Sequence, residues 1–316
     1  MISGVIQGRE RRLKPQRSRA NKNWMLWCLA FPGLLCVFIW NYLPMTGLVM
    51  AFQDLDLSKG LFTSPWVGLD NFKYLFASSD AWIITRNTIC YNLVFIFFNM
   101  VFSVILAVIL HELTHRLFAK VSQTVLIMPY FLSAVVVSAI VFAFLSPTDG
   151  FINALLKDAG EAPVKWYSKP EVWPYFLVFI YLWQNVGYSS ILYSAVLSGI
   201  PTEYYEAALI DGATKFQQFR YITLPQLRFV LSINLIRGIG NLFKSGLGMF
   251  YTIPRDSGPL FPVTNVLDTY IYRGLKVTND LGMTTAAGFY QSVVGLILVL
   301  IANKIISKID SESAMF

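Results

Sequence analysis

Charged residues are scarce in this chain of 316 residues. Only 14% of the residues are Asp, Glu, Lys or Arg, whereas 55% are hydrophobic and the mean hydropathy is +0.55. A soluble domain carries about 25% charged residues, which cover its surface. The shortage of charge therefore excludes a soluble globular protein and predicts a chain that lies mainly within a membrane.

Cysteine and histidine are rarer still, with three and two residues. Cys28, Cys36 and Cys90 all fall within long apolar stretches, and none of them forms a CxxC pair. We expect them to pack as small apolar residues, without a disulfide or a bound metal.

The hydrophobic residues of the chain are gathered into long apolar runs. A helix of about 20 residues crosses the roughly 30 Å of bilayer hydrocarbon. Six stretches are long enough, and none contains Asp or Glu: Trp24–Met50, Thr85–Leu110, Ser122–Ser146, Val172–Ser198, Gln226–Phe250 and Thr284–Ile305. The sequence thus predicts an all-α integral membrane protein with six transmembrane helices. Pro32 and Pro44 predict a kink or an unravelled outer end in the first.

The distribution of charge predicts the orientation of the chain. Seven Lys and Arg residues crowd the segment 9–22, whereas the segments 51–84, 147–171 and 251–283 hold most of the carboxylates. Basic residues favour the cytoplasmic side, so both termini are predicted to be cytoplasmic. We interpret 1–23 as a cytoplasmic basic tail, 24–306 as the transmembrane domain and 307–316 as a cytoplasmic C-terminal tail. The basic tail is an orientation signal in this interpretation, and no nucleic-acid partner is expected.

The predicted inner loop, residues 199–225, has an ordered pattern. Pro201, Glu203 and Glu206 suit the start of a helix, and Asp211-Gly212 suits its end. A second short helix is predicted from Ala213 to about Ile222, with Phe216 and Phe219 on one face. Pro225 is predicted to begin the next span. The pattern predicts an exposed helix–turn–helix elbow at the membrane surface.

This loop resembles the signature of the permeases of binding-protein-dependent ABC importers. That family shares EAA, three residues, Gly, nine residues and Ile-x-Leu-Pro. All of these positions are present at the same spacing: Glu206, Ala207, Ala208, Gly212, Ile222, Leu224 and Pro225. The resemblance implies the type I ABC importer permease topology. It also implies that the loop, including Asp211, Phe216 and Phe219, is a coupling helix that docks on a cytoplasmic ATPase.

Other segments are similar to narrower branches of that family. Tyr42–Phe52 and Pro65–Phe72 resemble carbohydrate-importing permeases. Asp268–Arg273 and Gly288–Leu296 resemble a branch that pairs with lipoprotein-type binding proteins and serves polysaccharide degradation. The resemblance implies a bacterial cytoplasmic (inner) membrane location. It further implies a complex of two permeases, usually different chains, with two ATPases and an extracytoplasmic sugar-binding protein.

Polar residues inside the predicted spans are candidates for the substrate path. Asn234, Arg237, Asn241 and Lys244 are spaced three, four and three residues apart, which places them on one helix face. An arginine at the bilayer centre costs about 2.5–3.5 kcal/mol, so Arg237 is expected to face a cavity or a partner subunit. Lys244 is expected to snorkel to water. Gln184, Asn185 and Tyr188 add candidates from the fourth span. Arg237 without an internal counter-charge suggests acidic, uronate-containing oligosaccharides, and neutral oligosaccharides remain the alternative.

Two motifs point to other classes of protein. Gly238–Ser245 approaches a P-loop, but Phe243 stands where the second glycine is required, so no nucleotide site or cofactor is expected in this chain. ATP and Mg²⁺ would be bound by the partner ATPases, and the chain itself would not be an enzyme. His111, Glu112 and His115 form HExxH, the zinc metalloprotease signature, with the two histidines at the i, i+4 spacing of one helix. An intramembrane metalloprotease is therefore the competing hypothesis. A polytopic receptor would leave the loop motif unexplained.

Overall fold

The computed structural model describes residues 24–309 except Leu57, Lys59, Phe62, Ser78, Ser79 and Thr114. The described secondary structure is helical, with one isolated bridge between Gln53 and Trp66. The all-α prediction is confirmed for this part of the chain. The predicted tail 1–23, and the C-terminal tail beyond Ile309, lie outside the described residues.

The chain divides into two compact units, Met1–Val49 and Met50–Phe316. In the first unit, α1 (Trp24–Val37) continues into a π-helical turn (Phe38–Tyr42) and then a 3-10 helix (Leu43–Phe52), which crosses the boundary. Leu26–Phe52 is long and apolar enough to span a membrane. The regular α-helix ends before Pro44, whose ring lacks an N–H for the helical ladder. The predicted unravelling of this segment is confirmed.

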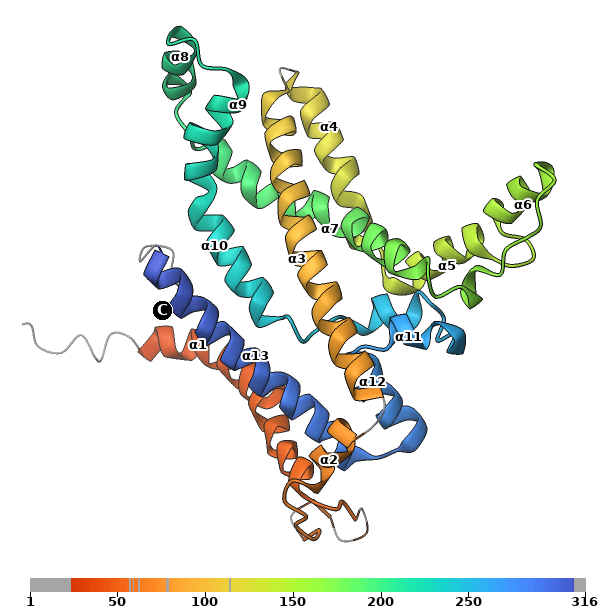
Figure 1. The fold of residues 1–316 in the computed structure, drawn as a ribbon. Coiled ribbons are helices and arrows are strands. Elements are labelled where there is room, and N and C mark those ends of the chain that lie inside the picture. Colours follow the sequence, from red (N-terminus) through yellow and green to blue (C-terminus); the bar gives the residue numbers. More distant parts are fainter. Residues whose placement is uncertain are drawn as a thin grey trace, which may run out of the picture. The chain divides into compact units, whose positions relative to one another are not determined.

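Two long helices organise the second unit. α3 (Asp80–Glu112) has 33 residues and α13 (Leu281–Ile309) has 29. Both can span a membrane by length and composition, as predicted. At 1.5 Å per residue, α3 is about 50 Å long. It runs from α2 (Asp70–Ala77) and α12 (Leu267–Arg273) at its Asp80 end to α8 (Thr202–Ile210) and α9 (Lys215–Gln218) at its Glu112 end (Figure 1).

The predicted third span is broken. α4 (Arg116–Ile127) and a 3-10 turn (Met128–Phe131) meet α5 (Ala134–Leu145) at a bend of 97°. Pro129 removes a backbone donor, and the Ser133 hydroxyl accepts a hydrogen bond from Val136 N (3.3 Å), which caps the new helix. The prediction of one continuous helix over Ser122–Ser146 is wrong. This pair would supply a fourth span if its two helices act as one.

The fourth and fifth predicted spans have different outcomes. α7 (Trp173–Leu197) matches the predicted Val172–Ser198 as one helix of 25 residues. α10 (Leu224–Gly240) stops ten residues before the predicted end at Phe250. Its C-cap Asn241 leaves the helical conformation (φ −96°, ψ 11°), and the next N–H, that of Leu242, bonds to the Ile239 carbonyl in a tighter turn (3.0 Å). The predicted continuous helix over Gln226–Phe250 is wrong. Neither α7 nor α10 is among the helices that are both long enough and apolar enough to cross a membrane. The count of six transmembrane helices therefore stays a prediction.

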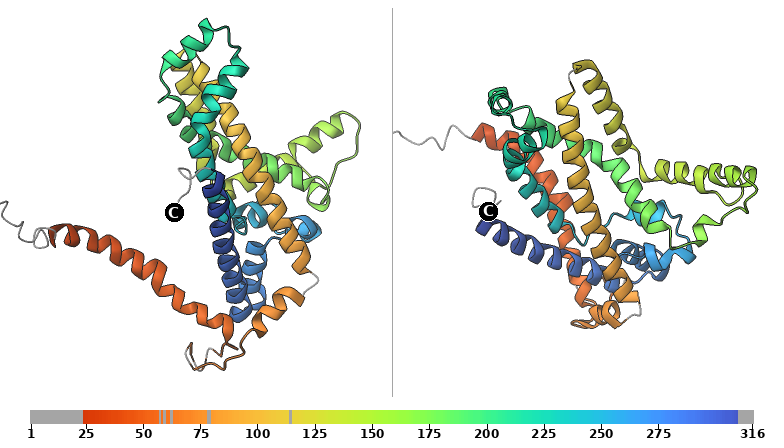
Figure 2. Two further views of the ribbon diagram at one scale, coloured as in Figure 1. Left: turned by 60° about the vertical axis from the view of Figure 1, so that its left-hand side comes forward. Right: turned by 45° about the horizontal axis from the view of Figure 1, so that its top comes forward.

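Close backbone approaches set how the helices pack. At Gly187 on α7, a Cβ atom would lie 1.9 Å from the Leu126 carbonyl oxygen of α4. Only glycine permits this contact without a backbone shift. Gly240 allows α10 to lie against a side chain of α13, since a Cβ there would be 2.3 Å from Val299 Cγ2. These contacts hold α7 and α10 beside their neighbours (Figure 2).

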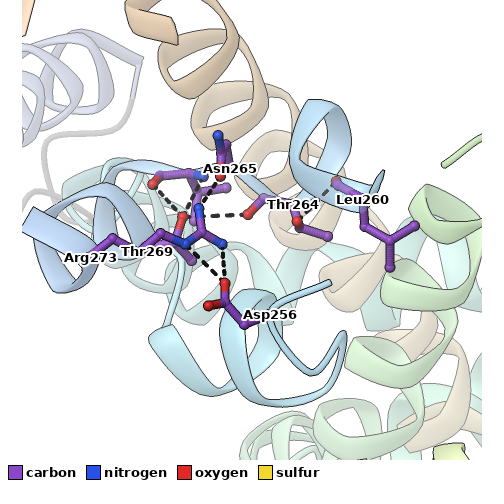
Figure 3. A network of polar contacts seen from close by, with 7 residues as sticks. Asp256, Leu260, Thr264, Asn265, Thr269 and Arg273 are labelled. Atoms are coloured by element: carbon purple, nitrogen blue, oxygen red, sulfur yellow. Dashed lines mark hydrogen bonds and ion pairs between the residues drawn. The ribbon is translucent and has the colours of Figure 1, made fainter. Parts of the chain in front are cut away.

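Short elements connect these long helices. α6 (Phe151–Asp158) and a 3-10 turn (Trp166–Ser168) precede α7, and α11 (Phe261–Thr264) and α12 follow α10. Three further helical turns occupy Gly248–Thr252, Gly258–Leu260 and Gly274–Thr278. An ion pair between Arg273 and Asp256 (2.6 Å) and a hydrogen bond from Arg273 to Asn265 tie this region together (Figure 3). Arg273 also lies 3.9 Å from the Phe261 ring centre.

Candidate functional site: a polar cavity and an exposed elbow

A cavity of about 500 Å³ lies midway along the long helices of the second unit. α3 contributes Asn92, Phe95 and Asn99, which are three and four residues apart and share one helix face. α7 contributes Tyr181, Tyr188, Ser189 and Tyr193. α10 and the turn after it contribute Asn234, Arg237, Asn241 and Lys244. The cavity is therefore a polar space within predominantly apolar helices.

In the described part of the chain, Arg237 and Lys244 are the charged residues of the lining, and no carboxylate lines the cavity. Both side chains are exposed in the isolated chain. Within the described residues, no ion pair neutralises either of them. The cavity thus has a net positive charge that an anionic ligand would balance.

Stacked aromatic rings give the cavity flat walls. The Phe95 and Tyr181 rings lie 3.9 Å apart with an angle of 7° between their planes. Tyr188 stacks in the same way on Tyr130, at 3.9 Å and 4°. Stacking restricts the rotamers of these rings, so the exposed Tyr188 ring is pre-arranged for a ring-shaped ligand, whereas Phe95 is buried behind Tyr181 (2% exposed).

Side-chain amides hold the helices around the cavity. Asn99 donates to Ser189 Oγ of α7 (3.1 Å) and accepts from Ser103 (3.0 Å). Asn92 donates to the Leu242 carbonyl and to Ser245 Oγ, both at 2.9 Å. The second set fixes the irregular chain beyond α10 against α3. Asn92 thereby supplies a donor to the Leu242 carbonyl, a backbone group in the irregular chain that follows the early end of α10.

The predicted substrate-path residues are only partly brought together. Tyr188, Asn234, Arg237 and Asn241 all line the cavity. The four residues predicted to share one face of the fifth span do not do so. Asn234 and Arg237 lie on α10, whereas Asn241 caps α10 and Lys244 lies beyond it. Lys244, predicted to snorkel, lines the cavity as well.

Two of the predicted path residues lie outside the lining. Gln184 donates to the Leu132 carbonyl (3.4 Å), and Asn185 donates to the Tyr181 carbonyl (2.9 Å). Their amides are therefore turned to the backbone of α7 and its neighbour.

Most residues of the cavity wall are not among those predicted from the sequence. Asn92, Asn99, Tyr181 and Tyr193 were not among the predicted residues, although all four line it. The two asparagines lie seven residues apart within a predicted span. Paired polar residues at that spacing on an apolar helix were the available signal.

The elbow predicted over 199–225 is present. α8 (Thr202–Ile210) follows Pro201 and ends at Asp211, and Gly212 has a positive φ of 76°. α9 (Lys215–Gln218) begins with a capping box between Thr214 and Gln217. A π-helical turn (Phe219–Thr223) then leads into α10, which begins at Leu224-Pro225.

The surface of the elbow is partly apolar. Leu209, Ile210 and Phe216 are exposed by 67%, 87% and 67%, and Glu206 and Ala207 are exposed beside them. Phe219 behaves differently from the prediction. It turns inward and packs on a core cluster with Tyr205 and Ile222, so Phe216 and Phe219 do not form one exposed pair. The exposed apolar side chains of α8 and α9 are available to a partner.

The zinc hypothesis fails on geometry. His111 belongs to the end of α3, which stops at Glu112, whereas His115 is the N-cap of α4. The histidines therefore do not sit one turn apart on a single helix, which the motif requires. Glu112 instead pairs with Lys215 of α9 (3.2 Å). In the described part of the chain, no three His, Cys, Asp or Glu residues are arranged to hold a metal ion.

The three cysteines also differ from expectation. Cys28, Cys36 and Cys90 are exposed on the isolated chain and do not pack within it. Cys90 lies on α3 beside an apolar groove that also includes Tyr91 and Phe179.

A polar cavity midway along apolar helices, with an exposed elbow beyond one end of them, defines a multi-pass membrane transport subunit. Residues 99–311, well over half of the chain, match the family of binding-protein-dependent transport system inner membrane components, and the chain belongs to that family. It is accordingly an ABC transporter permease, a subunit that is not itself an enzyme.

Two relatives from Bacillus subtilis (strain 168) are similar along nearly their whole length. Protein LplB is 33% identical over 287 residues, covering 91% of this chain and 90% of that protein. The polygalacturonan/rhamnogalacturonan transport system permease protein YteP is 32% identical over 290 residues, covering 91% and 89%.

Solved structures show the same fold. One is a bacterial ABC transporter involved in the import of the acidic polysaccharide alginate. It has a TM-score of 0.82 and 30% identity, covering 92% of this chain and 97% of that chain. A second is a bacterial alginate ABC transporter in complex with an alginate pentasaccharide-bound periplasmic protein. It has a TM-score of 0.82 and 29% identity, covering 92% and 96%.

Proposed function

We propose that this chain is the translocation subunit of an ATP-driven importer of acidic oligosaccharides. The observation that carries the proposal is the cavity between α3, α7 and α10, whose lining of described residues includes Arg237 and Lys244 and no carboxylate. The similarity to permeases described as transporting polygalacturonan, rhamnogalacturonan and alginate supports the same substrate class.

The cavity has the groups that an acidic sugar needs. The guanidinium of Arg237 can bind a carboxylate through two parallel hydrogen bonds. The amides of Asn99, Asn234 and Asn241 can exchange hydrogen bonds with hydroxyls, because an amide both donates and accepts. The Tyr181 ring, stacked on Phe95, offers an apolar wall to a pyranose. A passing anion would also offset the cost of placing Arg237 within the membrane.

The proposed complex contains a second permease chain, two ATPase subunits and an extracytoplasmic sugar-binding protein. Both termini would be cytoplasmic, as the basic residues between 9 and 22 favour. The elbow would then face the cytoplasm and dock on an ATPase through exposed residues of α8 and α9. Leu209, Ile210 and Phe216 suit an apolar groove of that partner.

Motion of the elbow can reach the cavity through one packed cluster. Tyr205 and Phe219 pack on buried Leu197, Leu227 and Tyr193, and Tyr193 also lines the cavity. Closure of the ATPases would move the elbow and, through this cluster, change the cavity from inward-facing to outward-facing. The transport step is a rigid-body change of access, and no covalent chemistry takes place in this chain.

Uptake by the complete transporter in proteoliposomes tests the substrate class. An acidic uronate oligosaccharide and a neutral oligosaccharide of equal length would be compared for the wild type, Arg237→Gln and Lys244→Gln. Lys157→Gln is the matched control, since Lys157 is a cation at the end of α6 outside the cavity.

The proposal expects Arg237→Gln to reduce uptake of the acidic sugar by roughly tenfold or more, as loss of a charge-assisted pair would. Uptake of a neutral sugar, where it occurs, would change little. Equal loss of both sugars would make Arg237 a structural residue at a subunit contact. Efficient uptake of the neutral sugar alone would favour the neutral-oligosaccharide alternative, for which the amides and rings of the cavity would suffice.

A further inference from the structure

A second polar cavity, of about 440 Å³, lies at the opposite end of α3 from the elbow. It is formed by the chain before α2, the start of α2 and the start of α13. Three carboxylates line it: Asp54, Asp70 and Asp280. We call it the acidic cavity. Among the described residues, no basic side chain is part of its lining, in contrast to the cavity at the middle of the helices.

The carboxylates retain unused capacity to accept hydrogen bonds. Asp70 is paired with Lys73 (2.5 Å), and Asp280 accepts from Met283 N (2.8 Å) as the cap of α13. Within the described residues, neither Asp54 nor Asp280 pairs with a cation. Two negative charges therefore face the cavity uncompensated.

A buried amide supplies an independent indication of a ligand. Gln53 lines the acidic cavity and is only 1% exposed, and its Oε1 has no hydrogen-bond partner among the residues that the structure describes. A buried acceptor left unpaired costs about 1–3 kcal/mol, which a bound donor would remove. The neighbouring Asn71 cannot serve, because its amide already donates to the carbonyls of Ala51 (3.1 Å) and Gln53 (2.9 Å).

The shape of the cavity favours a large cation over a metal ion. In the part of the chain that the structure describes, no three carboxylates converge on one point as metal ligands would. The acceptors are instead spread around a space large enough for a side chain. An arginine has five N–H donors in a planar fork and a lysine has three on a long stem, so either can satisfy separated acceptors.

The position of the acidic cavity identifies the source of this cation. α3 is about 50 Å long and separates the acidic cavity from the elbow. In the proposed orientation, the acidic cavity opens on the extracytoplasmic side, where the sugar-binding protein must dock. We propose that the acidic cavity receives a basic side chain, Arg or Lys, of that binding protein. This inference rests on the proposed function for the orientation and for the partner.

The test measures ATPase activity of the complete transporter in lipid nanodiscs as its own sugar-loaded binding protein is added. Asp54→Asn removes one charge while keeping the size of the side chain, and Asp54→Lys places a cation in the cavity. Glu161→Gln is the matched control, since Glu161 is an exposed acid in the predicted outer segment 147–171 and does not line the cavity. Co-purification of the ATPases confirms assembly of each variant.

Asp54→Asn is expected to raise the half-saturating concentration of binding protein by roughly tenfold at low salt, and Asp54→Lys by more. The effect should shrink at high salt, and Glu161→Gln should match the wild type. Unchanged half-saturation in both Asp54 variants, with normal stimulation, would overturn the inference and leave the proposed function intact. An absence of stimulation in the wild type would instead contradict the proposed function.

The remaining alternative is that the acidic cavity binds calcium, and a further set of titrations tests it. The same titrations would be run with EDTA and with added CaCl₂, and calcium binding to the wild-type complex would be measured directly. The proposal expects no dependence on calcium. Binding of calcium that is lost in Asp54→Asn would identify the acidic cavity as a metal site and overturn the proposed contact.

Discussion

The amide of Asn234 donates a hydrogen bond to the hydroxyl of Tyr193, at a distance of 3.4 Å. Asn234 belongs to α10 and Tyr193 to α7, and both line the central cavity. Tyr193 is also 2% exposed within the cluster on which Tyr205 and Phe219 of the elbow pack. One side chain is thus shared by the cavity and by the core beneath the elbow.

This relationship predicts that Tyr193→Phe weakens coupling between ATP hydrolysis and transport. The ring would keep its packing, and the bond to Asn234 would be lost, a change worth about 0.5–1.5 kcal/mol. We expect roughly three- to tenfold more ATP hydrolysed per sugar imported. Tyr188→Phe is the matched control, because Tyr188 lines the cavity but is not part of that cluster. An equal change in both variants would contradict a special role for Tyr193.

The elbow gives a second prediction at Gly212. Its φ of +76° is a left-handed conformation, and no atom lies within 4 Å of an added Cβ. A substitution therefore acts through backbone strain of about 1–2 kcal/mol, and not through a clash. Gly212→Val should reduce binding-protein-stimulated ATPase activity, whereas Gly212→Asn should retain most of it, because asparagine tolerates this conformation. Equal activity of the two variants would show that the turn is not needed for coupling.

Packing of α7 gives a third prediction. A Cβ at Gly187 would lie 1.9 Å from the carbonyl oxygen of Leu126, so Gly187→Ala must displace backbone. We expect a loss of stability of about 1–3 kcal/mol, seen as a lower melting temperature of the purified complex. Gly288→Ala in α13 is the control, since nothing lies within 4 Å of its added Cβ. A helical glycine in open space gains stability on such a change, so that variant should melt no lower than the wild type.

The network of Figure 3 gives a fourth prediction. Asp256 accepts two hydrogen bonds from Arg273, at 2.9 and 2.6 Å, and the Arg273 side chain is 18% exposed. Asp256→Asn keeps the left-handed backbone that Asp256 adopts (φ 49°) but removes the charge. Partial exposure screens this pair, so we expect a loss of about 1 kcal/mol. The more exposed Lys73–Asp70 pair is the comparison, with side chains 76% and 56% exposed, and Lys73→Gln should leave the melting temperature unchanged.

Long elements were predictable because hydropathy and length determine them. The helices over 85–110, 172–198 and 284–305 could be predicted, since a run of about 20 apolar residues has few other stable forms in a membrane. The elbow was equally predictable. Pro201, Gly212 and Pro225 each restrict the backbone locally, and the observed helix ends follow them.

The breaks within the predicted spans depend on tertiary contacts, so hydropathy and length could not predict them. α10 stops at Gly240, where the chain beyond it is held by Asn92 from α3, 150 residues away in sequence. The 97° bend between α4 and α5 had a local signal in Pro129, but its size depends on packing. The cavity could be predicted only in small part for the same reason. Arg237 stood out as a charge in a span, whereas Asn99 and Tyr193 acquire significance only when α3 and α7 meet.

Uptake of labelled oligosaccharides by the reconstituted complex tests the central claim most directly. The wild-type permease would be assembled with its partner permease, its ATPases and its binding protein, and supplied with an acidic or a neutral oligosaccharide of equal length. We predict ATP-dependent uptake of the acidic sugar, lost in Arg237→Gln and retained in Lys157→Gln. ATP-dependent uptake of the neutral sugar alone, or acidic uptake that does not depend on Arg237, would contradict the account.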